Sequence, residues 1–471
     1  MTNSKSLNEI QENIRSGFRV SALVDQYLKR IEETKDLNIY IEVFAEDAKK
    51  QAEILDDKIA AGKEVGKLAG CIVSIKDVLC YKDHKVSAAS KILDEFTSPY
   101  SATAINNLIA EDAIIIGRTN CDEFGMGSAN TNSIYGATKN GIDDTRVPGG
   151  SSGGAAVSVQ QNTCLIALGS DTGGSVRQPA SFCGVYGLKP TYGKVSRYGL
   201  IAYASSFDQI GIIGHNPEDI AATLEVISGK DKMDATSTEG FSTVDNKDLK
   251  DLKIGVFDSL INHTSLDHEI KNNLDIELTK LSKAGSTITN YPFKYADYLV
   301  PTYYVLTTAE ASTNLSRYDG VRYGHRSDSS ETLEDMYVNT RTEGFGKEVK
   351  RRIILGTYVL SEGYYDAYFN KAQQSRRLIH DEIEKVLEEN DIIILPTSTN
   401  LPWELNQNDL DPVSIYLSDM YTVIANLTGM PCISVPTGNN KDGLPFGIQL
   451  LSNKFNEQLL LSIAKKIAEI V

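Results

Sequence analysis

Residues 165–175 read Leu-Ile-Ala-Leu-Gly-Ser-Asp-Thr-Gly-Gly-Ser, a short apolar run that ends in a polar, glycine-rich loop. Similar apolar runs occupy residues 70–75 and 113–116, and apolar residues at helical spacing occupy 104–109 and 217–227. Short buried strands that alternate with helices are typical of an α/β fold with parallel strands. We therefore expect an α/β fold with a central mixed, largely parallel sheet flanked by helices on both faces.

A second series of elements is expected in the other half of the chain. The same reasoning predicts strands at 253–257, 392–395, 433–435 and 446–451. It predicts helices at 266–281, 304–317, 362–389 and from 457 onward. A chain of 471 residues can form one large α/β domain or several smaller ones, so length alone leaves the number of domains open.

The charge, the cysteines and the lengths of the apolar runs exclude several classes of protein. The chain has 47 Lys and Arg against 63 Asp and Glu, a net charge of −16, which argues against nucleic-acid binding as its main role because phosphate contacts need clustered cations. The six cysteines form no CxxC pair, which favours a reducing compartment. No apolar run approaches the ~18 residues of a membrane span, and the N-terminus resembles no targeting peptide. We expect a cytoplasmic protein that does not contact a membrane.

Two glycine- and serine-rich segments, 148–154 and 169–175, are the strongest chemical signal. Glycine lets backbone N–H groups converge on an oxyanion or a phosphate, whereas a flexible linker is unexpected between buried strands. Gly150-x-Ser152-x-Gly154 lacks the apolar strand that precedes a hydrolase nucleophile elbow. Asp171-Thr172-Gly173 lacks the second carboxylate of an aspartic protease, and neither segment has the lysine of a phosphate loop. Serine nucleophile chemistry of another kind remains.

A serine nucleophile needs a base, and none of the six histidines has a recognisable triad partner. Lysine can serve when burial keeps it neutral. Lys76 directly follows the apolar run 71–75, which makes it a candidate base. A buried ion pair with the neighbouring Asp77 explains its position equally well, and the residues alone leave both interpretations open.

The spacing of Lys76, Ser151 and Ser175 resembles the Ser-cis-Ser-Lys triad of the amidase-signature family. The glycine- and serine-rich segments 146–154, 169–180, 187–193 and 196–199 resemble that family's signature. Within the family, the chain is most similar to the glutaminase subunits of tRNA-dependent amidotransferases. That similarity rests on segments 122–128, 205–211, 314–320 and 345–352. Small departures, Val78 and Ala155-Ala156, do not touch the triad.

The resemblance implies roles for individual residues. Ser175 would be the nucleophile, Ser151 would relay its proton, and Lys76 would be the base, with a cis bond before Ser151. Backbone N–H groups of Thr172, Gly173, Gly174 and Ser175 would form the oxyanion hole.

The implied substrate is glutamine. Arg352 would pair with its α-carboxylate and Asp419 with its α-ammonium group, while Tyr303, Tyr304 and Ser128 would line the pocket. For Arg352, a solvated basic face is the alternative, because it ends the charged run Lys350-Arg351-Arg352.

The resemblance also implies partners. The B and C subunits of a heterotrimeric amidotransferase would complete the enzyme; the B protein would bind the tRNA, use ATP and Mg²⁺, and receive ammonia through an internal tunnel. We expect no cofactor and no metal in this chain. A stand-alone amidase acting on another small or fatty amide is the alternative, and an inactive scaffold protein is a third possibility. Because the site residues must meet in one pocket, we expect a single domain over 1–471, with a catalytic core at about 65–228 and the remainder, 229–471, completing the pocket and the outer helices.

Overall fold

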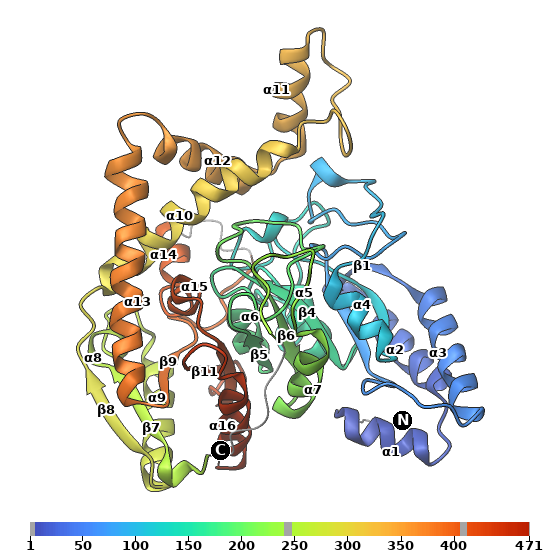
Figure 1. Ribbon diagram of the computed structural model, residues 1–471, viewed down its shortest axis with the longest axis horizontal. Coiled ribbons are helices and arrows are strands. Elements are labelled where there is room, and N and C mark those ends of the chain that lie inside the picture. Colours follow the sequence, from blue (N-terminus) through green and yellow to red (C-terminus); the bar gives the residue numbers. More distant parts are fainter. Residues whose placement is uncertain (1–4, 240–246, 406–411, 471) are drawn as a thin grey trace.

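A mixed sheet of eleven strands runs through the molecule, in the order β1-β3-β2-β4-β6-β5-β10-β11-β9-β7-β8 (Figure 1). The computed structural model describes residues 5–239, 247–405 and 412–470. The strands are β1 (Tyr40–Val43), β2 (Ile72–Lys76), β3 (Ile114–Thr119), β4 (Ile166–Asp171), β5 (Tyr186–Lys189), β6 (Gln209–Gly214), β7 (Lys253–Phe257), β8 (Thr287–Tyr291), β9 (Ile392–Pro396), β10 (Cys432–Asn439) and β11 (Pro445–Leu451).

Helices connect and cover these strands. They are α1 (Leu7–Arg15), α2 (Val20–Glu33), α3 (Ala45–Ala60), α4 (Thr103–Ala110), α5 (Gly153–Gln160), α6 (Arg177–Cys183), α7 (Pro217–Ile227), α8 (Asp258–Ile261), α9 (His268–Lys283), α10 (Leu299–Asn314), α11 (Leu333–Gly344), α12 (Lys347–Leu360), α13 (Lys371–Glu389), α14 (Pro412–Leu417), α15 (Val423–Thr428) and α16 (Glu457–Ile470).

Both faces of the sheet are covered, as expected. Successive residues of a strand point to opposite faces. In β9, Ile392 and Ile394 belong to one buried cluster, with Leu460 of α16, whereas Ile393 and Leu395 belong to another, with Ile379 of α13. The α/β class and the mixed sheet with helices on both faces are therefore confirmed.

The expectation of a largely parallel sheet is wrong. Among the described strands, four pairings are parallel (β2 with β3, β2 with β4, β7 with β8, β7 with β9) and six are antiparallel. The antiparallel strands β6 and β11 are buried along their whole length. An apolar run that is buried on both faces reads the same in either direction, so the sequence pattern could not reveal the orientation.

Most predicted elements are present with small boundary shifts, and one is divided. The helix expected at 362–389 begins at Lys371 as α13, because a π-helix over Tyr365–Asn370 precedes it. The strands β1, β5, β6 and β8 were not predicted, nor were several helices, among them α3, α6, α11 and α12. Among the described residues, no helix is both long enough and apolar enough to cross a membrane.

The topology gathers the glycine- and serine-rich segments at one edge of the sheet. Strands β2 and β4 are parallel neighbours, so Lys76 at the end of β2 and Asp171 at the end of β4 lie at the same edge. Ser151 and Ser152 directly precede α5, which packs against both strands. Helices α10, α12, α13 and α15 pack on one another (Figure 1). Of these, α10 supplies Tyr303 and Tyr304 to the site and α12 supplies Arg352.

Candidate active site

The Lys76 amine is enclosed by three serine hydroxyl groups. Its Nζ lies 2.7 Å from Ser151 Oγ, 2.9 Å from Ser152 Oγ and 2.9 Å from Ser170 Oγ. Lys76 has no exposed surface, and this burial lowers the pKa of its amine from the usual value, because burial penalises the charged form. The sequence alone did not single out Ser170 or Ser152 as partners of the lysine, although both lie in the two serine-rich segments.

Lys76 and its neighbour Asp77 have separate partners. Asp77 points to the other side of β2, where its carboxylate accepts hydrogen bonds from Arg118, from the Ser87 hydroxyl (2.6 Å) and from the Ala89 N–H (2.7 Å). Arg118 is its ion-pair partner. Adjacent residues in a strand face opposite sides, so a Lys76–Asp77 pair does not form.

Ser175 lines a small cavity beside this lysine site. The cavity is lined by Gly125, Gly127, Ser128, Gly173, Ser175, Tyr303, Tyr304, Arg352 and Asp419. The Ser175 hydroxyl makes no hydrogen bond to any other described residue, while its carbonyl accepts from the Ser152 N–H (3.1 Å). The Gly150–Ser151 bond is cis, as the resemblance implies.

The loop after β4 is held by a buried ion pair. Asp171 accepts hydrogen bonds from the N–H groups of Gly174 (2.9 Å) and Val176 (3.2 Å) and from both Nε and Nη2 of Arg177. Burial alone would raise the pKa of Asp171, but the Arg177 guanidinium holds it at about 2. Gly174 was predicted to contribute to the oxyanion hole, yet its N–H is already occupied. Among the described residues, the N–H groups of Thr172, Gly173 and Ser175 have no protein acceptor, so these three remain available for an oxyanion.

Arg352 is buried at one wall of the cavity and is not part of a solvated face. Its Nε donates to Glu348 (2.9 Å) and its Nη1 to the Tyr203 hydroxyl (2.8 Å). Its guanidinium lies over the rings of Tyr203 and Tyr304, 5.5 and 5.3 Å from their centroids. Nη2 donates to no other described residue, which leaves one amino group for a bound carboxylate.

Asp419 lies on the cavity wall and is bound by two other lining residues. Its carboxylate accepts from the Ser128 hydroxyl (3.0 Å) and from the Tyr304 hydroxyl (2.9 Å). Burial raises the pKa of Asp419 to about 6. The structure therefore brings Ser128, Tyr303, Tyr304, Arg352 and Asp419 together with Ser175 in one cavity.

One group of side chains outside the cavity has metal-ligand spacing. On α13, His380, Asp381 and Glu384 have donor atoms close to one another. The Lys454 amine lies 3.3 Å from His380 Nε2, and a cation at that position opposes the binding of a second one. The group has no contact with the residues described above.

Comparisons with known proteins match nearly the whole chain. The family model described as Amidase matches residues 22–461. The A subunit of glutamyl-tRNA(Gln) amidotransferase from Chlorobaculum parvum is 50% identical, over 94% of this chain and 93% of its own length. The crystal structure of the corresponding A subunit from Thermotoga maritima is 36% identical, with a TM-score of 0.77, and the match covers 95% of this chain and 91% of that one. A bacterial aryl acylamidase shares the fold at 20% identity, with a TM-score of 0.85 over 99% of this chain and 96% of that one.

Proposed function

This chain belongs to the amidase-signature family, and on that premise we propose that it hydrolyses glutamine and supplies the ammonia that converts Glu-tRNA(Gln) to Gln-tRNA(Gln). The observation that carries this proposal is that one cavity contains a serine hydroxyl, a buried guanidinium and a buried carboxylate, which are Ser175, Arg352 and Asp419. A small amide with both a carboxylate and an ammonium group complements this set, whereas a fatty amide does not.

The hydrogen bonds around Lys76 suit it to act as a base. A neutral amine has two N–H donors and one lone pair. The Ser152 hydroxyl donates to the Ser170 carbonyl oxygen (3.2 Å), so its lone pairs are free to accept from Lys76. When the other N–H bonds to Ser170 Oγ, the amine lone pair is left for the hydroxyl proton of Ser151, which is the nearest of the three groups.

In the proposed reaction, Ser175 Oγ attacks the side-chain amide carbon of glutamine, and its proton passes through Ser151 to Lys76. The negative charge on the amide oxygen is stabilised by the N–H groups of Thr172, Gly173 and Ser175; one such donor typically contributes about 3 kcal/mol. Lys76 then returns the proton through Ser151 to the amide nitrogen, the C–N bond breaks, and ammonia leaves. Water hydrolyses the glutamyl ester by the same route and releases glutamate.

The α-carboxylate and α-ammonium groups of glutamine complement Arg352 and Asp419 in the cavity. The free Nη2 of Arg352 would bind the α-carboxylate, and the Asp419 carboxylate would bind the α-ammonium group. Arg and carboxylate groups form charge-assisted hydrogen bonds, about twice as strong as neutral ones. Tyr304 holds Asp419 in place through its hydroxyl, and the Tyr303 ring lies against Gly173, where an added Cβ would contact its hydroxyl oxygen.

The relatives' names refer to one component of a multi-subunit enzyme. We propose that this chain works with the B and C subunits of such an enzyme. The B protein would bind the tRNA and use ATP and Mg²⁺ to activate its glutamate, and the C protein would join the other two. This chain would then need no cofactor of its own, and its contact with tRNA would be mainly indirect.

Substitution of the nucleophile tests the proposal. In the assembled enzyme, Ser175→Ala should abolish glutamine-dependent formation of Gln-tRNA(Gln) and leave the reaction with ammonium chloride intact. A matched control is Ser158→Ala, a buried serine of α5 that bonds to Ser74 and Cys164 and does not contact Lys76. Glutamine-dependent turnover in Ser175→Ala would contradict the assignment. Efficient hydrolysis of a fatty or aryl amide by the chain alone would favour the stand-alone amidase.

A further inference from the structure

Asp208 is a buried carboxylate that the proposed reaction does not use. It directly precedes β6, and the antiparallel register of β4 and β6 pairs Asp171 with Gln209. This pairing places Asp208 across from Thr172, the first residue of the loop that carries Gly173 and Ser175. The sequence contains Asp208 within the segment 205–211, but gives no sign of what it contacts.

The Asp208 carboxylate joins two segments of the site. One oxygen accepts from the Thr172 hydroxyl (2.7 Å), and the other accepts from the backbone N–H groups of Tyr203 (2.9 Å) and Ala204 (3.0 Å). Hydrogen bonds to an ionised carboxylate are stronger than neutral ones. Thr172 and residues 203–204 are thereby fixed relative to each other.

The connection continues to the substrate-binding arginine. The Tyr203 hydroxyl accepts from Arg352 Nη1 (2.8 Å) and donates to Thr307 Oγ1 (3.0 Å) on α10. A chain of contacts therefore runs from Thr172 through Asp208 and Tyr203 to Arg352. Its two ends are the oxyanion loop and the group that would bind the α-carboxylate.

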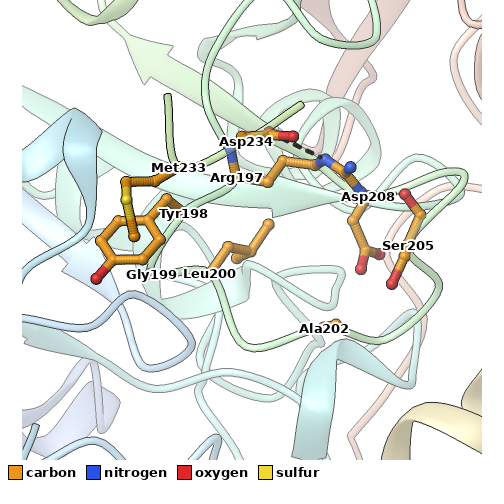
Figure 2. A pocket seen from close by; sticks show the side chains of 9 residues that line it. All are labelled: Arg197, Tyr198, Gly199, Leu200, Ala202, Ser205, Asp208, Met233 and Asp234. Atoms are coloured by element: carbon orange, nitrogen blue, oxygen red, sulfur yellow. Dashed lines mark hydrogen bonds and ion pairs between the residues drawn. The ribbon is translucent and has the colours of Figure 1, made fainter. Parts of the chain in front are cut away.

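On its other side, Asp208 borders a second cavity of about 280 Å³, shown in Figure 2. Among the described residues that line this cavity, Arg197 is the one cation, and its Nε pairs with Asp234 at 3.6 Å (Figure 2). Its Nη1 donates to the Ser205 carbonyl and its Nη2 to Thr236. Among the described residues, the Asp208 carboxylate therefore accepts hydrogen bonds only from Thr172 and from residues 203–204.

We propose that Asp208 is a positioning residue that sets the separation between the oxyanion donors and Arg352, and so favours amides that carry an α-carboxylate. This inference rests on the proposed glutaminase function. A substrate bound at both ends reacts well only when the separation between the oxyanion donors and Arg352 matches its length, because small displacements from the reactive geometry slow the reaction strongly. A ligand without the α-carboxylate does not bind Arg352, so its binding does not depend on this separation.

The test compares glutamine with 4-aminobutanamide, which is glutamine without its α-carboxylate, in the assembled enzyme. For Asp208→Asn we expect kcat to fall and KM for glutamine to rise, each about tenfold, the loss typical of one hydrogen bond to a charged group. The inhibition constant of 4-aminobutanamide should change less than about twofold, since that ligand does not need Arg352. Asp234→Asn, which removes the same charge from the wall of the same cavity, should leave all three constants unchanged.

A double-mutant cycle separates positioning from general damage. Tyr203→Phe removes the hydrogen bond with Arg352. Its effect on kcat and KM for glutamine should be less than about a third as large in the Asp208→Asn background as in the wild-type enzyme, because the effects of coupled residues are not additive. Thr172→Val removes the hydrogen bond between Thr172 and Asp208 from the threonine side, and it replaces Asp208→Asn in the cycle if that variant does not fold. Equal losses for both ligands, or effects of Asp208→Asn and Tyr203→Phe that multiply, would overturn the proposal. If wild-type enzyme does not hydrolyse glutamine, the proposed function fails instead.

Discussion

The three hydroxyl groups around Lys76 divide into one that takes part in the proposed proton transfer and two that orient the amine. Ser152 and Ser170 each lie 2.9 Å from Nζ and are fully or largely buried. With both as acceptors, the lone pair of the neutral amine faces Ser151. Removal of either acceptor would let the amine rotate and leave a buried N–H without a partner.

We therefore predict that Ser170→Ala and Ser152→Ala each lower kcat for glutamine by about 10- to 100-fold, as expected for an unpaired buried donor next to the base. KM for glutamine should change little, because neither serine lines the substrate cavity. Steady-state glutaminase kinetics of the assembled enzyme measure both constants, with Ser158→Ala as the control. A rise in KM with unchanged kcat would show that these serines act on substrate binding.

Asp419 predicts a particular pH dependence. Its pKa is raised to about 6, so the carboxylate that would bind the α-ammonium group is ionised above that pH and becomes neutral as the pH falls through it. KM for glutamine should therefore rise below about pH 6. With 4-carbamoylbutanoate, which lacks the amine, this rise should be absent, while the loss of kcat caused by protonation of Lys76 should be common to both substrates. Identical KM profiles would contradict the role of Asp419.

The site residues differ in how far the sequence could reveal them. Lys76 stands out as a candidate because it ends an apolar run, whereas the choice of Ser151 and Ser175 among the serines of the two glycine-rich segments comes from the resemblance to the amidase-signature family. Arg352 does not stand out, since a charged run on a helix normally faces solvent; only the packing of α12 against α10 buries it. The contact of Asp208 with Thr172 depends on strand register, which a single sequence does not specify.

The short connection between β6 and α7 contains His215, a titratable residue that is suited to a test of stability against pH. His215 follows β6, and burial lowers the pKa of its imidazole to about 4, with the charge of Lys5 acting in the same direction. Below pH 6.5 the unfolded chain takes up a proton that the folded protein excludes until about pH 4. The free energy of unfolding therefore falls across this window, by up to about 3 kcal/mol.

His215→Asn should remove this loss, because asparagine can keep the contact with Val159 and does not titrate. Urea unfolding of wild type and variant at pH 7 and pH 4.5 gives the comparison. The difference between the two proteins should shift in favour of the variant at pH 4.5. The carboxylates with altered pKa values are present in both proteins, so their contributions cancel. A pH-independent difference would show that His215 does not titrate as described.

Helices and strands were predicted correctly where the apolar periodicity agrees with the residues that begin or end an element. The strand at 253–257 and the helix at 217–227, with Asn216 as its cap and Pro217 at its first turn, have the predicted bounds. Strands β5 and β6 lie in glycine-rich sequence that weakens any periodic signal, and β1 is short and only partly buried. The π-helix before α13 interrupts a pattern that otherwise reads as one helix.

At the level of the whole molecule, the cavity and the adjoining lysine site combine residues from both halves of the chain. Lys76 ends β2 and Ser175 lies on the loop after β4, whereas Arg352 and Asp419 come from the helical region after β8. The net charge of −16 is consistent with tRNA being bound by a partner.

We predict that this chain alone binds tRNA at least about 100-fold more weakly than the assembled enzyme at physiological salt, because it offers few clustered cations for counterion release. Fluorescence anisotropy with labelled tRNA, at two salt concentrations, measures both affinities. Tight, salt-dependent binding by the isolated chain would contradict this expectation and would give it a direct role in tRNA recognition.

Attack of Ser175 on glutamine is the step on which the proposed function depends, and the covalent intermediate tests it most directly. Acid-quenched enzyme, digested after mixing with glutamine, can be examined by mass spectrometry for a glutamyl group. We predict this group on the peptide that contains Ser175, and its loss in Ser175→Ala. A glutamyl group on another residue, or ammonia release from glutamine by Ser175→Ala at the wild-type rate, would contradict the assignment of Ser175 as the nucleophile.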